Sequence, residues 1–152
     1  MADRAIEVSG DDYNIYVPIA NGLGRLGLEE RLGPIRQQQM RTMERQLESV
    51  PEDTRARILL AALYASLKRE ADAVRELQIA MALRPKDSNI LYNAACVYGL
   101  LGRKADALAV LKKSVQSGYH FVIDWAARDS DLACLHDDPE FQKLLAAGQQ
   151  KS

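Results

Sequence analysis

The chain has 152 residues, the size of one domain, and is long enough to bury a continuous apolar core without metals or disulfides as extra cross-links. Its 20 Lys and Arg residues against 21 Asp and Glu residues leave a formal net charge of −1, which disfavours nucleic acid and anionic membranes as partners. Alanine and leucine are abundant while the chain has only two Phe and one Trp, a composition that predicts an all-α fold.

The cysteines and the hydropathy pattern indicate a compartment. Cys96 and Cys134 are far apart and form no CxxC pair, which suits a reducing environment. The N-terminal MADRAIEVSGDDY lacks the apolar core of a signal peptide, and the chain has no run of apolar residues long enough to span a membrane. We expect a soluble, cytoplasmic protein.

Residues 1–12 come first in the chain. Their RAIEVSGDD is similar to the last turns of a helix followed by an exit turn. Two interpretations remain open: an N-terminal cap on a helical stack, or the remnant of a preceding repeat in a longer protein.

Residues 13–53 predict two helices, the second over about 29–49. Apolar residues recur at helical spacing in both: Tyr16, Ile19, Ala20, Leu23, then Leu32, Ile35, Met40, Met43 and Leu47. Pro18 inside a helix would cost ~3 kcal/mol, so the first helix either begins near Val17 or bends there. Gly33-Pro34 is expected to shorten or kink the second helix.

Residues 54–87 and 88–118 carry one pattern twice. LKREADAVREL, from Leu67, aligns with LGRKADALAVL, from Leu101, at an offset of 34 residues. The pairs at this offset are Pro51 and Pro85, Asp53 and Asp87, Ala61 and Ala95, Tyr64 and Tyr98, Leu67 and Leu101, Arg69 and Arg103, Ala71 and Ala105, Asp72 and Asp106, Ala73 and Ala107, and Leu77 and Leu111.

Each period predicts an antiparallel helical hairpin. The small residues that let two backbones approach are Ala61, Ala73, Ala95 and Ala107, with Tyr64 and Tyr98 filling the space beside them. Pro51 and Pro85 follow the second helix of a hairpin, where proline stops a helix. Asp53 and Asp87 then offer N-caps for the next helix.

These units resemble tetratricopeptide repeats (TPRs). The residues that carry the resemblance are Leu60, Ala61, Tyr64, Ala73, Leu77, Ala80 and Pro85 in one unit, and Ala94, Ala95, Tyr98, Gly102, Ala107 and Leu111 in the next. Residues 13–53 form a similar unit that is seven residues, or two helical turns, longer. The resemblance implies a right-handed superhelix of antiparallel hairpins, closed by a C-terminal helical cap in residues 119–152.

The tail begins after Ser117-Gly118, where a left-handed helix stop is easy. Asp138-Pro139 predicts a helix start, with the carboxylate as N-cap and proline at the first position. The apolar residues expected to give this helix an inner edge are Phe141, Leu144 and Leu145, and those expected to cover the last repeat are Trp125, Leu132 and Leu135.

The tail resembles the closing segment that follows TPR arrays in many bacterial proteins, some with serine/threonine kinase or nucleotide cyclase domains upstream. The residues that carry this resemblance are Asp124-Trp125, Asp129, Asp131-Leu132, Leu135, Asp137-Asp138-Pro139, Phe141-Gln142 and Leu144-Leu145.

Cys134, His136 and Asp137 raise the question of a metal or nucleophile site. A structural zinc site needs four ligands in spaced pairs, and no second pair accompanies these residues. We therefore predict no metal site, no cofactor and no catalytic residue, and interpret the acids as caps and turn residues. Without a glycine-rich phosphate loop, a nucleophile elbow or a paired acid and base, the chain is not expected to be an enzyme.

The first helices of stacked hairpins would line a concave groove. The residues predicted to face it are Asn21, Arg55, Ile58, Ala62, Asn89, Tyr92, Asn93, Cys96 and Leu100. Such a groove suits an extended peptide or an amphipathic helix, with Tyr92, Ile58 and Leu100 as anchors. Alternatively, Asn21 and Asn93 bond to neighbouring helices, and the wall is filled by the chain's own long helix or by a second copy.

Similar repeats in other proteins hold a carboxylate with lysines, asparagines and an arginine. The matching positions here hold Val17, Asn21, Leu59, Asn89 and Asn93. No cation stands among them, which disfavours carboxylate capture.

The sequence therefore predicts a protein-protein interaction or scaffolding module that binds a protein or peptide partner. The alternative is a C-terminal regulatory domain of a larger bacterial signalling enzyme, such as a serine/threonine kinase or nucleotide cyclase. The resemblance of the tail, and the start of the chain that resembles the remnant of a preceding repeat, are the two features that support this second hypothesis.

Overall fold

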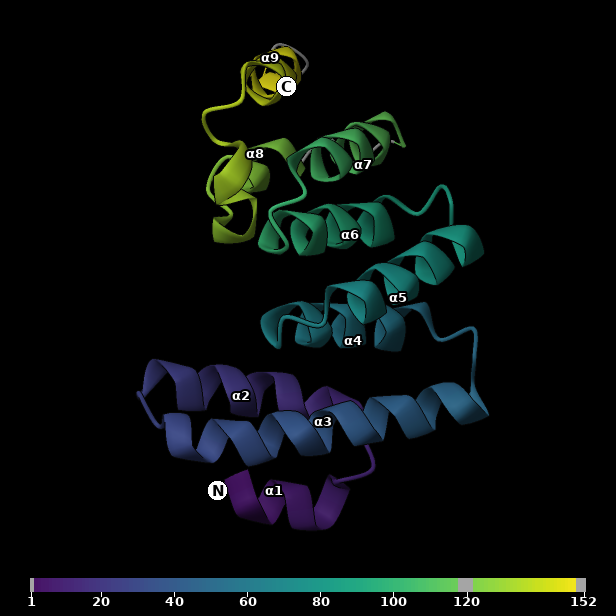
Figure 1. Ribbon diagram of the computed structural model, residues 1–152, viewed down its shortest axis with the longest axis vertical. Helices are drawn as coiled ribbons and strands as arrows, with labels where there is room; N and C mark the ends of the chain where they lie inside the picture. Colours follow the sequence, from purple (N-terminus) through teal and green to yellow (C-terminus); the bar gives the residue numbers. More distant parts are fainter. Residues whose placement is uncertain (1, 118–121, 150–152) are drawn as a thin grey trace.

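The computed structural model describes residues 2–117 and 122–149, and within these ranges the chain forms helices and no β-strand, so the all-α prediction is confirmed. The elements are α1 (Ala2–Ser9), η1 (Tyr13–Ile15), α2 (Tyr16–Arg25), α3 (Glu29–Ser49), α4 (Thr54–Ser66), α5 (Glu70–Leu83), α6 (Ser88–Leu100), α7 (Lys104–Gln116), α8 (Val122–Ala126), η2 (Ser130–Leu135) and α9 (Pro139–Gln149). Helices α2 to α7 pack as successive hairpins along one direction, with α1 at one end and the tail beside and beyond α6 and α7 (Figure 1).

The turns inside the three hairpins share one backbone geometry. Each turn has three residues, and its middle residue, Gly27, Lys68 or Gly102, has a positive φ of 67°, 61° or 72°. The amide after each of these residues donates to the carbonyl five residues earlier, at 3.0, 2.8 and 2.9 Å. This bond is typical of a Schellman helix stop, which favours glycine. The helical hairpin is therefore one local structure repeated along the chain, with Lys68 in a conformation that suits glycine better.

The predicted helix stops and caps are in place. Pro51 and Pro85 follow the ends of α3 and α5. Asp53 Oδ1 accepts a hydrogen bond from the Ala56 amide at 2.9 Å. Asp87 Oδ1 accepts from two amides in the first turn of α6, at 3.0 and 3.1 Å. These carboxylates satisfy amides that have no partner within the helix.

The hairpins pack through the small residues of the repeat. Those with no exposed surface are Ala61, Ala73, Ala95 and Ala107. Tyr64 and Tyr98 are buried, and the guanidinium groups of Arg69 and Arg103 lie over their rings, at 4.3 and 5.5 Å from the ring centres. The Tyr64 hydroxyl also donates to Glu44 at 2.7 Å, which ties α4 to α3.

A buried ion pair joins the helices of the middle hairpin. Arg57 on α4 pairs with Glu76 on α5, and their side chains are only 12% and 7% exposed. Removing Glu76 would leave the half-buried guanidinium of Arg57 with only the Pro51 carbonyl oxygen as an acceptor among the described residues, at 2.9 and 2.7 Å.

The two prolines of the first hairpin lie within helices. Pro18 is the third residue of α2, where an amide would have no partner within the helix, so the helix begins at Tyr16 without loss of a hydrogen bond. Pro34 lies inside α3, and the helix continues through it from Glu29, so this residue does not shorten the helix.

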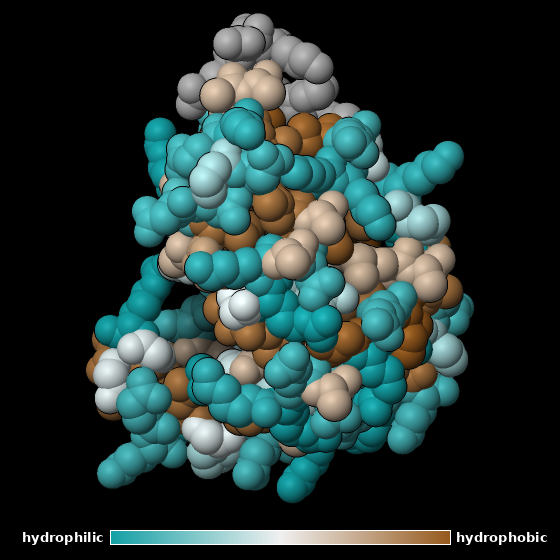
Figure 2. Space-filling model, turned by 45° about the horizontal axis from the view of Figure 1, so that its top comes forward, coloured by the Kyte–Doolittle hydropathy of each residue, from teal (hydrophilic) through white to brown (hydrophobic). Residues whose placement is uncertain are grey.

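The first hairpin is offset from the others. Helix α3 packs along α4, whereas α2 contacts α3 and η1 and has few contacts with α4. The 21 residues of α3 extend past the end of α4, and α2 packs along α3 rather than along α4 (Figure 1). The surface has a recess on this side of the molecule, at the left of Figure 2. The first helices of the hairpins thus form a continuous wall between α4 and α6, but not between α2 and α4.

The tail packs mainly as expected. Leu132, Leu135 and Phe141 have no exposed surface, and Asp138 Oδ1 accepts from the amides of Glu140 and Phe141 at 2.8 and 3.2 Å. The predicted start of α9 is therefore confirmed. The predicted stop at Gly118 and the domain boundary after it lie outside the described residues.

The prediction that Trp125 covers the last repeat is wrong, because its side chain is 62% exposed. Helix α8 has only five residues, and its inner face is occupied by Ile123 and Ala126, which are 3% and 1% exposed. Trp125 lies on the other face of this short helix and points to solvent.

Candidate functional site

The residues predicted to line a groove lie on three helices. Asn21 is on α2, which stands away from α4, so it is not brought together with the others. The exposed members on α4 and α6 are Arg55, Asn89 and Leu100, the half-buried members are Ala62 and Asn93, and the buried members are Ile58, Tyr92 and Cys96. Asn93 bonds within its own helix, donating to Asn89 O at 2.8 Å and Oδ1 at 2.9 Å.

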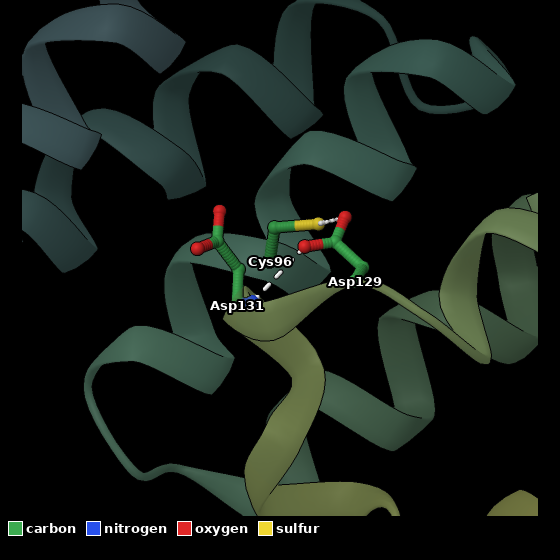
Figure 3. A group of neighbouring side chains, drawn as sticks. All are labelled: Cys96, Asp129 and Asp131. Carbon is green, nitrogen blue, oxygen red and sulfur yellow. Dashed lines mark hydrogen bonds between the residues drawn. The ribbon is translucent and has the colours of Figure 1, made fainter. Parts of the chain in front are cut away.

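Tyr92 and Cys96 are buried because the chain's own tail lies over them. The Tyr92 hydroxyl donates to Asp129 Oδ2 at 2.6 Å, and Cys96 Sγ lies 3.6 Å from the same oxygen. Asp129 Oδ1 accepts from the Asp131 amide at 3.0 Å and so begins η2. Figure 3 shows the Cys96 sulfur directed at Asp129, with the Asp131 carboxylate on the opposite side. Asp129 therefore joins α6 to the tail.

Gly99 permits the close approach of the tail to α6. A Cβ atom built on Gly99 would lie inside 3.0 Å of the Asp131 carbonyl oxygen, 3.2 Å from its carbon and 3.4 Å from Leu132 Cδ2. The equivalent residue of the preceding hairpin is Ala65, and that of the first hairpin is Gly24, where an added Cβ would meet no atom within 4 Å. A glycine inside a helix is typical of close backbone approach.

Burial sets the protonation of this cluster. It raises the pKa of the Tyr92 hydroxyl and the Cys96 thiol, and the hydrogen bond or charge of Asp129 raises both further. Both groups therefore stay protonated at neutral pH and donate to the Asp129 carboxylate. Burial, and then the charge of Asp129, also raises the pKa of Asp131.

Cys96, Asp129 and Asp131 offer one sulfur and two carboxylate oxygens within 4.8 Å of one another. Zinc coordination would require the thiolate, which the raised pKa of Cys96 disfavours. Asp129 already accepts from Tyr92, Cys96 and the Asp131 amide. We interpret the group as a hydrogen-bonded latch between α6 and the tail.

A pocket opens beside this latch. Its volume is about 610 Å³, and its lining residues are Tyr92, Asp124, Trp125, Arg128 and Asp129, which we call the tail pocket. Trp125, Asp124 and Arg128 are exposed. The side chains of Asp124 and Arg128 form no ion pair or hydrogen bond with the residues that the structure describes. The tail pocket thus combines two aromatic rings with charges that are free to meet a ligand.

Sequence reasoning found only Tyr92 among the residues of this pocket. It assigned Trp125 to the core and did not single out Arg128. The available signal was the position of the chain's one tryptophan between charged residues, in WAARD preceded by Asp124. A core tryptophan is usually flanked by apolar neighbours on its buried face.

The residues first weighed as a metal site have separate surroundings. Cys134 is half-buried and packs against the core. The His136 ring stacks against Phe141, with 6.0 Å between ring centres, and its Nε2 atom is buried with no hydrogen-bond partner among the described residues. Neither residue belongs to the cluster of Cys96, Asp129 and Asp131.

None of the described helices combines the length and the apolar composition needed to cross a lipid bilayer. The sequence matches no protein-family model, no curated protein and no solved structure. The functional conclusion therefore depends on the geometry alone.

Proposed function

We propose that the protein is a TPR-like helical repeat protein of the cytoplasm that binds a protein or peptide partner, with the tail pocket at the centre of the binding site. The repeated hairpin supports this proposal. The left-handed residues Lys68 and Gly102, and the capping residues Asp53 and Asp87, recur at the 34-residue period of the sequence. A scaffold of stacked hairpins holds its exposed faces rigidly for a partner.

The exposed Trp125 beside the pocket is the observation that carries the proposal. Tryptophan, tyrosine and arginine are the residues that contribute most to protein interfaces, and the tail pocket contains one of each. Covering the exposed part of one large apolar side chain contributes about 2 to 3 kcal/mol. The partner would gain this energy without rearranging the fold, because Trp125 already points to solvent.

The neighbouring surface of α4 and α6 extends the proposed site. Leu100, which is 45% exposed, and Arg55 provide further apolar and polar contacts on these helices. Tyr92 and Ile58 are buried, so they support the surface rather than act as freely accessible anchors. The proposed role needs no catalytic residue and no cofactor.

Site-specific photo-crosslinking in cells of the source organism tests this function. A photoreactive derivative of phenylalanine, which keeps an aromatic ring at the site, replaces Trp125 in one variant and Leu83 in the control. Leu83 is also exposed, at 42%, but ends α5 away from the pocket. We expect a discrete crosslinked protein from position 125 and not from position 83. No crosslink, or the same products from both positions, would contradict the proposed site.

A further inference from the structure

The tail is far more acidic than the rest of the chain. Residues 122–140 contain six acids and a single Lys or Arg, Arg128, whereas the whole chain has a net charge of −1. The acids are Asp124, Asp129, Asp131, Asp137, Asp138 and Glu140. Of these, Glu140 is neutralised by Lys112 and Lys143, at 3.2 and 2.9 Å. The other acids have no ion pair among the described residues, so the tail carries uncompensated negative charge.

The lining of the tail pocket also carries a net negative charge. Asp124 and Asp129 face one cation, Arg128, and the Asp131 carboxylate lies within 4.8 Å of Asp129. Asp129 is engaged in the latch, but Asp124 is exposed and has no partner among the described residues. An anionic ligand would meet one guanidinium and several carboxylates, which disfavours it.

The aromatic residues favour a cation as well. The faces of Trp and Tyr rings attract ammonium and guanidinium groups. Trp125 is exposed, and Asp124 is the residue next to it in the pocket lining. A cation that packs against the indole can therefore pair with a free carboxylate.

On the basis of the proposed function, we propose that the tail pocket binds a lysine or arginine side chain of a basic segment in the partner protein. The cation packs against Trp125 and pairs with Asp124, while Tyr92, fixed by its bond to Asp129, forms the floor. Arg128 opposes this binding and so limits its affinity. Charge complementarity between the acidic tail and a basic segment directs the approach of the partner.

Selection from a library of short random peptides displayed on phage tests this inference with the intact protein. We expect the selected peptides to be enriched in Lys and Arg over Asp and Glu. One selected peptide, labelled with fluorescein, and its Lys/Arg→Gln version then serve as probes in anisotropy titrations. The Gln version is expected to bind at least about five-fold more weakly.

Three variants at exposed positions distinguish the contacts while leaving the core intact. Trp125→Leu is expected to weaken binding of the basic peptide about five- to ten-fold, through loss of the aromatic face. Asp124→Asn is expected to weaken it about three-fold, and Arg128→Gln to strengthen it by a similar factor, since one change removes an attractive charge and the other a repulsive one. Added salt should reduce the difference between the last two variants.

The outcomes separate this inference from the proposed function. Enrichment of acidic peptides would overturn the basic partner while leaving peptide binding intact. So would tighter binding by Asp124→Asn together with weaker binding by Arg128→Gln, the reverse of the expected effects. The inference would also be overturned if the selection yields no peptide, or if Trp125→Leu binds the selected peptides as well as the wild type does. The crosslinking at position 125 then decides separately whether the pocket binds a protein.

Discussion

Gly99→Ala is the substitution that tests most sharply how the tail docks on α6. The added Cβ atom would lie inside 3.0 Å of the Asp131 carbonyl oxygen, which is backbone and cannot rotate away as a side chain could. To reach ordinary contact of 3.4 Å or more, η2 must move away from α6 by more than about 1 Å. That shift disturbs Leu132, which has no exposed surface and lies 3.4 Å from the new atom.

The magnitude follows from two opposing effects. Overpacking a well-filled site costs about 1 to 3 kcal/mol, and a clash with backbone places this site in the upper part of that range, at about 2 to 3 kcal/mol. Alanine in a helix interior is about 1 kcal/mol more favourable than glycine, which offsets part of this cost. We therefore expect Gly99→Ala to lower the free energy of unfolding by about 1 to 2 kcal/mol, or the melting temperature by about 3 to 6 °C. The matched control is Gly22→Ala in α2, where no atom lies within 4 Å of the added Cβ, and it should raise the melting temperature by about 2 to 4 °C.

Urea and thermal denaturation give the stabilities of both variants, and hydrogen exchange shows where the change lies. In Gly99→Ala, the amides of residues 123–135 are expected to exchange faster, with α4 and α5 unchanged. If Gly99→Ala stabilises the protein as much as Gly22→Ala does, the tail does not pack on α6 as described.

Three further predictions concern other parts of the fold. Lys68→Gly relieves a left-handed φ of 61° and should stabilise the protein by about 0.5 kcal/mol. Gly102→Ala at the equivalent turn should destabilise it by about 1 kcal/mol. If urea denaturation gives the two variants the same change in stability, the turns do not share one geometry. Glu76→Ala breaks the buried ion pair between α4 and α5 and should lower the free energy of unfolding by about 3 to 5 kcal/mol. Asp72→Ala removes more exposed ion pairs and should lower it by about 1 kcal/mol or less. Similar losses of stability in urea denaturation would refute the role of the buried pair. Because the folded state raises the pKa of Asp131, its protonated form favours folding, and stability falls as the pH rises through that raised pKa. The melting temperature of Asp131→Asn should therefore be higher than that of the wild type at neutral pH and equal to it in acid. A lower melting temperature of the variant at neutral pH would show that the fold needs the carboxylate.

The sequence predicted the parts of the fold that depend on local rules. The 34-residue period placed the hairpins, and Asp53, Asp87 and Asp138 were correctly assigned as caps, because capping depends on a few adjacent residues. The second helix of residues 13–53 was also placed correctly, as α3. Pro18 left two alternatives open, and the helix start at Tyr16 is the one observed.

The site could not be predicted, because it depends on contacts between segments far apart in the chain. Asp129 lies 37 residues after Tyr92, and no local pattern indicates that they bond. The placement of Trp125 was wrong, since apolar character alone does not say which face of a five-residue helix is covered. Gly99 was the available clue, because a glycine at the place of Ala65 indicates that something approaches that side of α6.

Hydrogen exchange of the intact protein, with and without the partner captured at position 125, tests the binding site most directly. If the partner binds at the tail pocket, exchange should slow in residues 88–100 and 123–131, which contain Tyr92, Trp125 and Arg128. Protection confined to α1, α3 or α5, with the tail and α6 unchanged, would contradict the site.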